Sequence, residues 1–187
     1  MFGLAAILLA GCAGDATNWS RATPPAGTKV VVVEFSDFNC PACSAAAATA
    51  NKIKNLPNLY FEFRHFPLPL VGHDSSPAAA NAFECARAQN FGEEMEAALF
   101  ANSGQLGEKL FLAIPKKYNF GENFDSAEFE KCVVDGEFDD FVQKDVNFAN
   151  SRGLNATPTF FVNGTKATRS NLLKTVAAAF ENANSIE

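Results

Sequence analysis

One short segment constrains the fold more than any other: a β-branched run that leads directly into two cysteines and an alanine-rich stretch. Residues 29–35 (KVVVVEF) are almost continuously apolar, which is typical of a strand buried on both faces of a sheet. Residues 36–39 are polar, and residues 40–56 favour a helix because alanine is the strongest helix former. Asn39 suits the N-cap, and proline is tolerated in a first helical turn. The segment therefore predicts a buried strand, a turn, and a helix that begins at Cys40-Pro-Ala-Cys43.

The spacing of apolar residues divides the rest of the chain into further elements. Residues 59–66 predict a second strand, parallel to the first because a helical crossover joins the two. Helical periodicity then predicts an insertion over about 74–152, with helices at 78–90, 93–102, 106–117 and 126–152. A third strand at 159–162, a hairpin signal at Asn163-Gly164, a short strand at 166–168 and an amphipathic helix at 171–182 complete an α/β fold.

Size and charge limit the class of protein. A chain of 187 residues is one domain, or one domain with a large insertion. The net charge of −6 leaves no basic patch to meet phosphates, which argues against a nucleic-acid partner.

The N-terminus is interpreted as a processing segment. Residues 2–10 are apolar but too short to span a bilayer, which takes roughly 20 residues in a helix. They fit the apolar region of a secretory signal, and residues 9–12 (LAGC) resemble a bacterial lipobox, although no basic residue precedes the run. That resemblance implies cleavage before Cys12 and a lipid on its sulfur; the alternative is a buried N-terminal strand with a free cysteine. Residues 13–28 are predicted to be a flexible tether to a domain at 29–187.

The pair Cys40 and Cys43 suits thiol–disulfide exchange. A helix N-terminus offers unpaired N–H groups and the positive end of the helix dipole, so a thiolate at Cys40 should be stabilised and its pKa lowered. Cys43 follows one turn later on the same face and can resolve a mixed disulfide that Cys40 forms with a substrate. The same spacing also occurs in zinc sites, which usually need a second close pair, and in purely structural disulfides.

The remaining cysteines, Cys85 and Cys132, stand alone on two predicted helices of the insertion. With Cys12 set aside as the lipid site, four cysteines remain, and an even number outside the cytosol suggests two disulfides. A structural Cys85–Cys132 disulfide is therefore expected, with two buried free thiols as the alternative.

Three motifs in order carry a resemblance to a known family. Residues 34–43 (EFSDFNCPAC) resemble the active-site segment of the DsbA-like branch of the thioredoxin superfamily, and residues 63–67 (FRHFP) with the helix through Cys85 resemble its second strand and insertion. Residues 157–164 (TPTFFVNG) resemble its cis-proline loop and the strand that follows. The resemblance covers roughly 29–182 and implies a thioredoxin-like fold with an inserted helical domain.

The resemblance also implies roles for particular residues. Cys40 would be the nucleophile, Cys43 the resolving thiol, and Pro158 a cis proline beside them, with Thr157 offering backbone groups to an extended substrate. On the sequence alone, a trans proline at the start of a strand is also allowed. Glu34 would be a buried acid that assists proton transfer at Cys43, with a raised pKa; otherwise it would point to solvent at a strand end.

The residues between the cysteines bear on the direction of the reaction. Pro41 and Ala42 are expected at the substrate-binding rim, and Pro41 matches the CPxC pattern of the oxidase branch. Ala42 offers the Cys40 thiolate neither a charge nor a hydrogen-bond donor. The Cys40–Cys43 redox couple is therefore expected to be less oxidising than the couples of the strongest oxidases in the family. Asp37 is interpreted as a turn residue, and His65 and His73 as structural side chains.

The leading functional hypothesis is a lipid-anchored, extracytoplasmic oxidase, at the bacterial periplasm or the outer face of the membrane. It would introduce disulfides into exported proteins and be reoxidised by a membrane redox partner. No cofactor besides the Cys40–Cys43 disulfide, no metal and a monomeric state are expected. A reductase or isomerase, a copper-binding thiol module, and a substrate-capture chaperone remain as alternatives.

Overall fold

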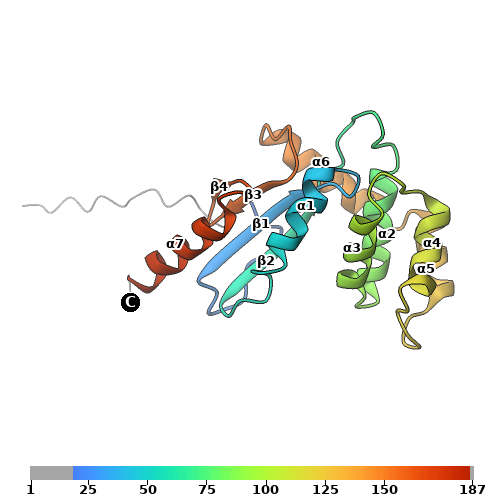
Figure 1. Ribbon diagram of the computed structural model, residues 1–187, viewed down its shortest axis with the longest axis horizontal. Helices are drawn as coiled ribbons and strands as arrows, with labels where there is room; N and C mark the ends of the chain where they lie inside the picture. Colours follow the sequence, from blue (N-terminus) through green and yellow to red (C-terminus); the bar gives the residue numbers. More distant parts are fainter. Residues whose placement is uncertain (1–18, 186–187) are drawn as a thin grey trace, which may run out of the picture.

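A four-stranded sheet forms the centre of the computed structural model, which describes residues 19–185 (Figure 1). The strand order is β2-β1-β3-β4. β1 pairs with β2 in parallel, whereas β3 is antiparallel to both β1 and β4. The strands are β1 (Val30–Ser36), β2 (Leu59–His65), β3 (Thr159–Val162) and β4 (Thr165–Ala167). All residues of β1 are buried, as the continuous apolar run predicts for a central strand.

Helices cover both faces of this sheet. Even-numbered residues of β1, such as Val30 and Val32, pack against Ala46 of α1 (Pro41–Ala50) and Leu172 of α7 (Leu172–Asn184). Odd-numbered residues, such as Phe35, pack against Ala149 of α6 (Asp139–Ser151). Because side chains alternate between the two faces of a strand, Glu34 and Ser36 share the face that α1 covers.

The predicted helical insertion forms a second layer beside the sheet (Figure 1). It comprises α2 (Ser76–Ala88), α3 (Gly92–Ala101), α4 (Glu108–Lys117), α5 (Ser126–Asp135) and α6. α2 lies at its centre and contacts each of the other four helices. The apolar core of this layer is continuous with Cys40 and Cys43, since Phe38, Phe83 and Phe100 pack in the same cluster as the two cysteines.

Two expected helices differ from those observed. The single helix expected over 126–152 is divided into α5 and α6 at Gly136, whose φ of 65° is left-handed and ends α5. The helix expected over 40–56 ends at Ala50, and residues 51–55 continue as turns with i→i+3 bonds such as Ile53 N to Ala50 O. The Asn163-Gly164 turn joins β3 and β4 with positive φ at both residues, as a two-residue hairpin requires.

Part of the segment predicted to be a flexible tether packs on the domain. The Trp19 ring stacks on Phe161 with centroids 3.5 Å apart, on the side of the sheet opposite α1. The Arg21 side chain binds the Glu62 carboxylate through Nε at 2.8 Å. Residues 19–21 are therefore fixed, because burial of an aromatic ring and an ion pair outweigh the flexibility that the polar composition suggested. The predicted signal segment and Cys12 lie outside the described residues, and none of the helices described is long and apolar enough to cross a bilayer.

Candidate active site

The dithiol lies where β1 leads into α1. The N-cap of α1 is Cys40 and not Asn39, which the sequence predicted, because the Asn39 side chain accepts from Gly104 N instead. The Cys40 carbonyl oxygen accepts from the N–H groups of Cys43 at 3.0 Å and Ser44 at 3.1 Å. Pro41 occupies the first turn, where no intrahelical donor is needed. Cys40 is 8% exposed and Cys43 fully buried, and the two sulfurs are not bonded to each other. The sequence-predicted pair is thus placed with one reachable sulfur and one sheltered sulfur.

The surroundings of Cys40 favour its thiolate. A hydrogen bond from the Cys43 thiol is the largest cause and, despite opposition from burial, the pKa of Cys40 falls from 9.0 to about 5. The Thr157 side chain and the backbone N–H groups of Cys43 and Ala42 lower this pKa further. The same hydrogen bond and burial raise the pKa of Cys43. At neutral pH the pair therefore holds one nucleophilic thiolate and one neutral thiol.

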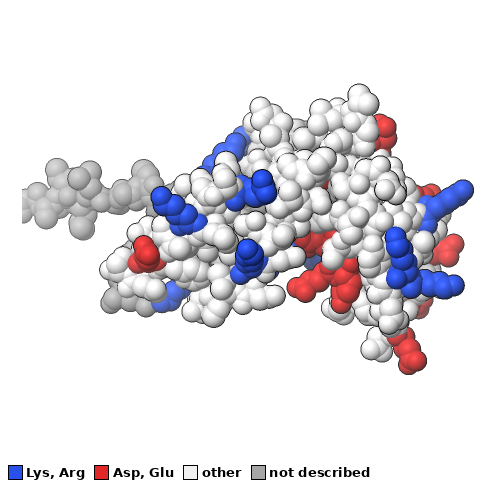
Figure 2. All heavy atoms as spheres, viewed as in Figure 1, with Lys and Arg blue, Asp and Glu red and all other residues white. Residues whose placement is uncertain are grey.

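The loop before β3 completes the outer side of the site. The Thr157–Pro158 peptide bond is cis, the isomer that the resemblance implied. The Thr157 carbonyl oxygen lies 3.5 Å from Cys40 Sγ. Thr157 and Pro158 are partly exposed, and Pro41 and Ala42 are exposed. In the view of Figure 2, the surface over the start of α1 carries little charge.

Glu34 lies beneath α1 and is 1% exposed, not at a solvent-facing strand end. Burial is the main reason that its pKa rises to about 8, and the Glu96 carboxylate adds to the effect. Lys54 and the Ser36 hydroxyl oppose it. Lys54 Nζ itself binds Glu96 Oε1 at 2.5 Å, so an ion pair between α3 and the end of the α1 segment faces the buried acid. The two residues also line a groove between α1 and α3, where acidic side chains gather in Figure 2.

The other polar residues that the sequence singled out have structural contacts. Asp37 Oδ1 accepts from Asn39 N at 2.8 Å, which forms the expected turn, and Asp37 Oδ2 accepts from Leu68 N at 3.0 Å. His73 Nδ1 lies 2.7 Å from Asp37 Oδ2, and His65 Nε2 lies 2.7 Å from Glu84 Oε1. The Asp37 bonds hold the loop after β2 against the segment that precedes Cys40, and the His65–Glu84 contact holds α2 against the end of β2.

Sequence reasoning missed the residues that fix the site to the helical layer. Asn39 Oδ1 accepts from Gly104 N at 3.1 Å, and the Ser44 hydroxyl donates to Phe100 O at 3.2 Å. The rings of Phe38 and Phe100 are 4.9 Å apart. These contacts join segments about 60 residues apart, and no local pattern signals them. The sequence alone could have shown only that Ser36 and Glu34, two residues apart in a strand, share one face of the sheet.

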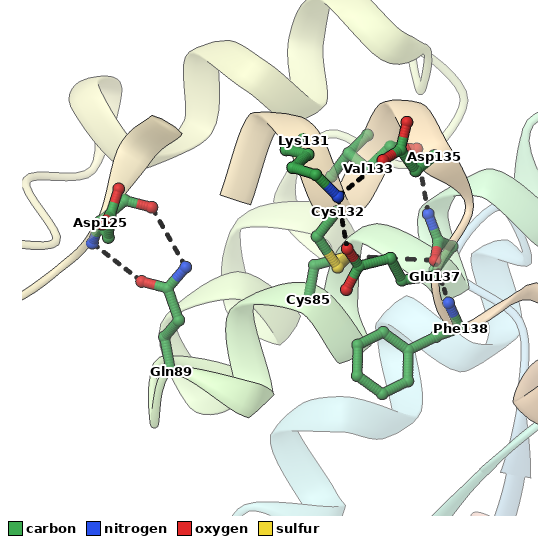
Figure 3. Close-up of a disulfide and its surroundings, with 10 residues drawn as sticks. Cys85, Gln89, Asp125, Lys131, Cys132, Val133, Asp135, Glu137 and Phe138 are labelled. Carbon is green, nitrogen blue, oxygen red and sulfur yellow. Dashed lines mark hydrogen bonds and ion pairs between the residues drawn. A yellow bond between two sulfur atoms is a disulfide. The ribbon is translucent and has the colours of Figure 1, made fainter. Parts of the chain in front are cut away.

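Cys85 and Cys132 form a disulfide that joins α2 to α5, with Cα atoms 5.9 Å apart (Figure 3). Gln89 and Asp125 exchange two hydrogen bonds between side chain and backbone nearby. The Asn81 side chain donates to Val133 O at 3.2 Å and accepts from Phe138 N at 2.9 Å. The disulfide and these bonds hold α5 and the α5–α6 turn against α2, within the insertion.

Comparison with known proteins agrees with this geometry. The family model described as Thioredoxin matches residues 25–182. A thioredoxin-like oxidoreductase from Silicibacter pomeroyi is 27% identical, with a TM-score of 0.69 over 90% of this chain and 98% of that chain. DsbA2 of Pseudomonas aeruginosa is 24% identical, with a TM-score of 0.64 over 83% of this chain and 95% of that one. The chain belongs to the thioredoxin family. Its inserted helical region, α2–α6, gives it a DsbA-like fold.

Curated relatives include much longer proteins. The Na(+)/H(+) antiporter NhaA 1 of Salinispora arenicola is 31% identical over 160 residues. The match covers 85% of this chain but 24% of the antiporter, so the chain spans about a quarter of that protein's length.

Proposed function

We propose that the protein is a thiol–disulfide oxidoreductase that forms and exchanges disulfides in exported proteins through Cys40 and Cys43. The observation that carries this proposal is the asymmetry of the pair: a reachable Cys40 with a pKa of about 5 beside a buried, neutral Cys43. Such a pair forms a mixed disulfide at Cys40 and resolves it with Cys43. The similar structure from Silicibacter pomeroyi is a thioredoxin-like oxidoreductase, which supports the same class.

The geometry favours oxidation as the direction. A disulfide becomes a stronger oxidant when its reduced form is stabilised, and a thiolate at Cys40 stabilises the reduced form. A pKa of about 5 lies between those of thioredoxin, about 7, and DsbA, about 3.5. Thr157 and Pro158 would bind an extended substrate beside Cys40, with Pro41 and Ala42 at the rim.

We further propose an extracytoplasmic location, with a lipid on Cys12 and a membrane redox partner. The lipobox-like residues 9–12 support the anchor, and the Cys85–Cys132 disulfide supports an oxidising compartment. That disulfide also removes Cys85 and Cys132 as ligands for a zinc site built on Cys40 and Cys43.

The reduction potential of the Cys40–Cys43 pair tests the proposal, by equilibration with glutathione buffers and alkylation of free thiols. We expect a value between roughly −270 mV, as in thioredoxin, and −120 mV, as in DsbA. A value at the thioredoxin end would assign a reductase instead. Failure to form a reversible disulfide would overturn the proposal, and copper bound to the purified protein would assign a metal-binding module.

A further inference from the structure

Three buried oxygen atoms around the dithiol have no hydrogen-bond partner within the described residues. They are Glu34 Oε1, Ser36 Oγ and Thr157 Oγ1. Buried polar atoms are almost always paired, because an unpaired one costs about 1–3 kcal/mol. Glu34 and Ser36 come from β1, and Thr157 comes from the loop before β3. The pKa of Cys43 responds to Ser36 and Thr157, and the pKa of Glu34 responds to Ser36. Their grouping therefore calls for a functional reason and not one of packing alone.

Ser36 acts on both Glu34 and Cys43. It shares with Glu34 the face of β1 that α1 covers, and both residues are 1% exposed. The Ser36 hydroxyl lowers the pKa of Glu34 and also that of Cys43, so it lies close to both the carboxyl group and the thiol. Its oxygen has no hydrogen-bond partner among the described residues. A hydroxyl is both a donor and an acceptor, and rotation about its C–O bond can connect the two groups in turn.

We propose that Ser36 is a proton-relay residue that carries a proton from Glu34 to Cys43 when the Cys40–Cys43 disulfide opens. This inference rests on the proposed function and names the path of the proton within the same site.

The step balances without any further reagent. A substrate thiolate attacks Cys40 Sγ, the new sulfur–sulfur bond forms, and the Cys40–Cys43 bond breaks with its electron pair on Cys43 Sγ. Cys43 takes the proton of the Ser36 hydroxyl while that hydroxyl takes the proton of the Glu34 carboxyl. Glu34 is left as a carboxylate and regains a proton from solvent later.

The groups that face Glu34 suit this role. Burial keeps its pKa at about 8, so the carboxyl holds its proton at neutral pH and can donate it. The Glu96 carboxylate on α3 and Lys54 Nζ act on it in opposite directions. Cys43 is fully buried, so bulk solvent does not reach its sulfur directly. A leaving thiolate there needs an internal proton donor.

The test is the rate at which excess glutathione opens the disulfide in a single turnover, divided by the concentration of glutathione thiolate. In the unaltered protein this corrected rate should fall above about pH 8, as Glu34 loses its proton. Ser36→Ala should lower the rate at pH 7 by about tenfold and weaken its decrease above pH 8. Proton donation accelerates such a step by about 10²–10⁴-fold, and a water molecule would replace part of the path in the variant. Ser36→Thr keeps the hydroxyl and should restore both the rate and its pH dependence.

Two further measurements separate this role from a structural one. The Cys40 thiolate absorbance at 240 nm should titrate unchanged in Ser36→Ala. The double variant Glu34→Gln/Ser36→Ala should be no slower than Glu34→Gln alone, which decides the matter even if Ser36→Thr misfolds. A Ser36→Ala rate within twofold of the unaltered protein, with the fall above pH 8 retained, would overturn the inference and leave the proposed function intact. A disulfide that does not open with glutathione at all would overturn both.

Discussion

The stability of the reduced protein relative to the oxidised protein should rise with pH. In the unfolded reduced chain Cys40 keeps its proton up to its ordinary pKa of 9.0. In the folded protein Cys40 loses this proton above about pH 5. Between these values the unfolded state binds more protons, so folding is favoured as pH rises. The gain is fully present above pH 9 and is lost as pH falls through 5. The oxidised form has no such thiolate and shows no such gain.

The magnitude follows from the shift. One pKa unit corresponds to roughly 1.4 kcal/mol of folding stability. Because pH 7 lies about two units above the folded pKa of Cys40, the gain at pH 7 is roughly 2.7 kcal/mol. The Cys40 sulfur is partly open to solvent, which screens the interaction, and we take about half, roughly 1.4 kcal/mol. For a domain of this size, that free energy is a relative shift in Tm of about 3–6 °C between pH 5 and pH 7.

The assay is thermal unfolding of the reduced and the oxidised protein at pH 5, 6, 7 and 8. The contribution of Glu34 to folding stability changes with pH in the opposite direction. Because its pKa is raised, this contribution is fully present below pH 4.5 and is lost as the pH rises through about 8. Glu34 is present in both forms, whereas the Cys40 thiolate is present only in the reduced form, so the difference between the two Tm values is the measure of the Cys40 contribution. A Cys40→Ala variant should follow the oxidised protein. A difference that stays constant from pH 5 to pH 8 would refute the reasoning.

Three more predictions concern stability. Glu34→Gln should raise the free energy of unfolding by roughly 2–3 kcal/mol at pH 7 and not at pH 4.5, because above pH 4.5 the unfolded chain ionises Glu34 while the folded protein must keep it protonated; equal gains at both pH values in denaturant titrations would contradict this. Replacing Cys85 and Cys132 by serine opens a loop of sequence separation 47 and should cost about 4 kcal/mol by chain entropy, measured by denaturant unfolding, while the Cys40–Cys43 potential stays unchanged. Trp19→Ala should cost roughly 2–3 kcal/mol in the same assay, because the ring stacks on Phe161; an unchanged midpoint would show that the segment does not pack in solution.

The sequence was sufficient for the fold because its local signals agreed with one another. The buried run at 29–35, the helix that follows it and the apolar strand at 59–66 require a parallel βαβ unit, and the structure contains it. The helix boundaries were less certain, because a single glycine in a left-handed conformation divides α5 from α6 within a continuous apolar pattern. Periodicity reports which face is apolar and not where a helix turns.

For the site, the sequence could identify the chemistry but not its setting. The spacing of Cys40 and Cys43 and the acid at Glu34 were visible in a single segment. The ion pair of Lys54 with Glu96 and the bond from Asn39 to Gly104 depend on how the helical layer docks on the sheet. Trp19 was assigned to a tether because its neighbours are polar, although one large ring is enough to fix a segment against an apolar sheet.

The packed segment at residues 19–21 has a consequence for self-association. β2 is an edge strand, and edge strands offer free backbone groups to which another chain can add. Here the Arg21 guanidinium donates to the Phe63 carbonyl, and the Arg21 backbone N–H donates to the Glu62 carboxylate at 3.0 Å. A strand from a second molecule would have to displace both bonds before it could pair. The segment thus shields the open side of the sheet from pairing with a strand of another chain.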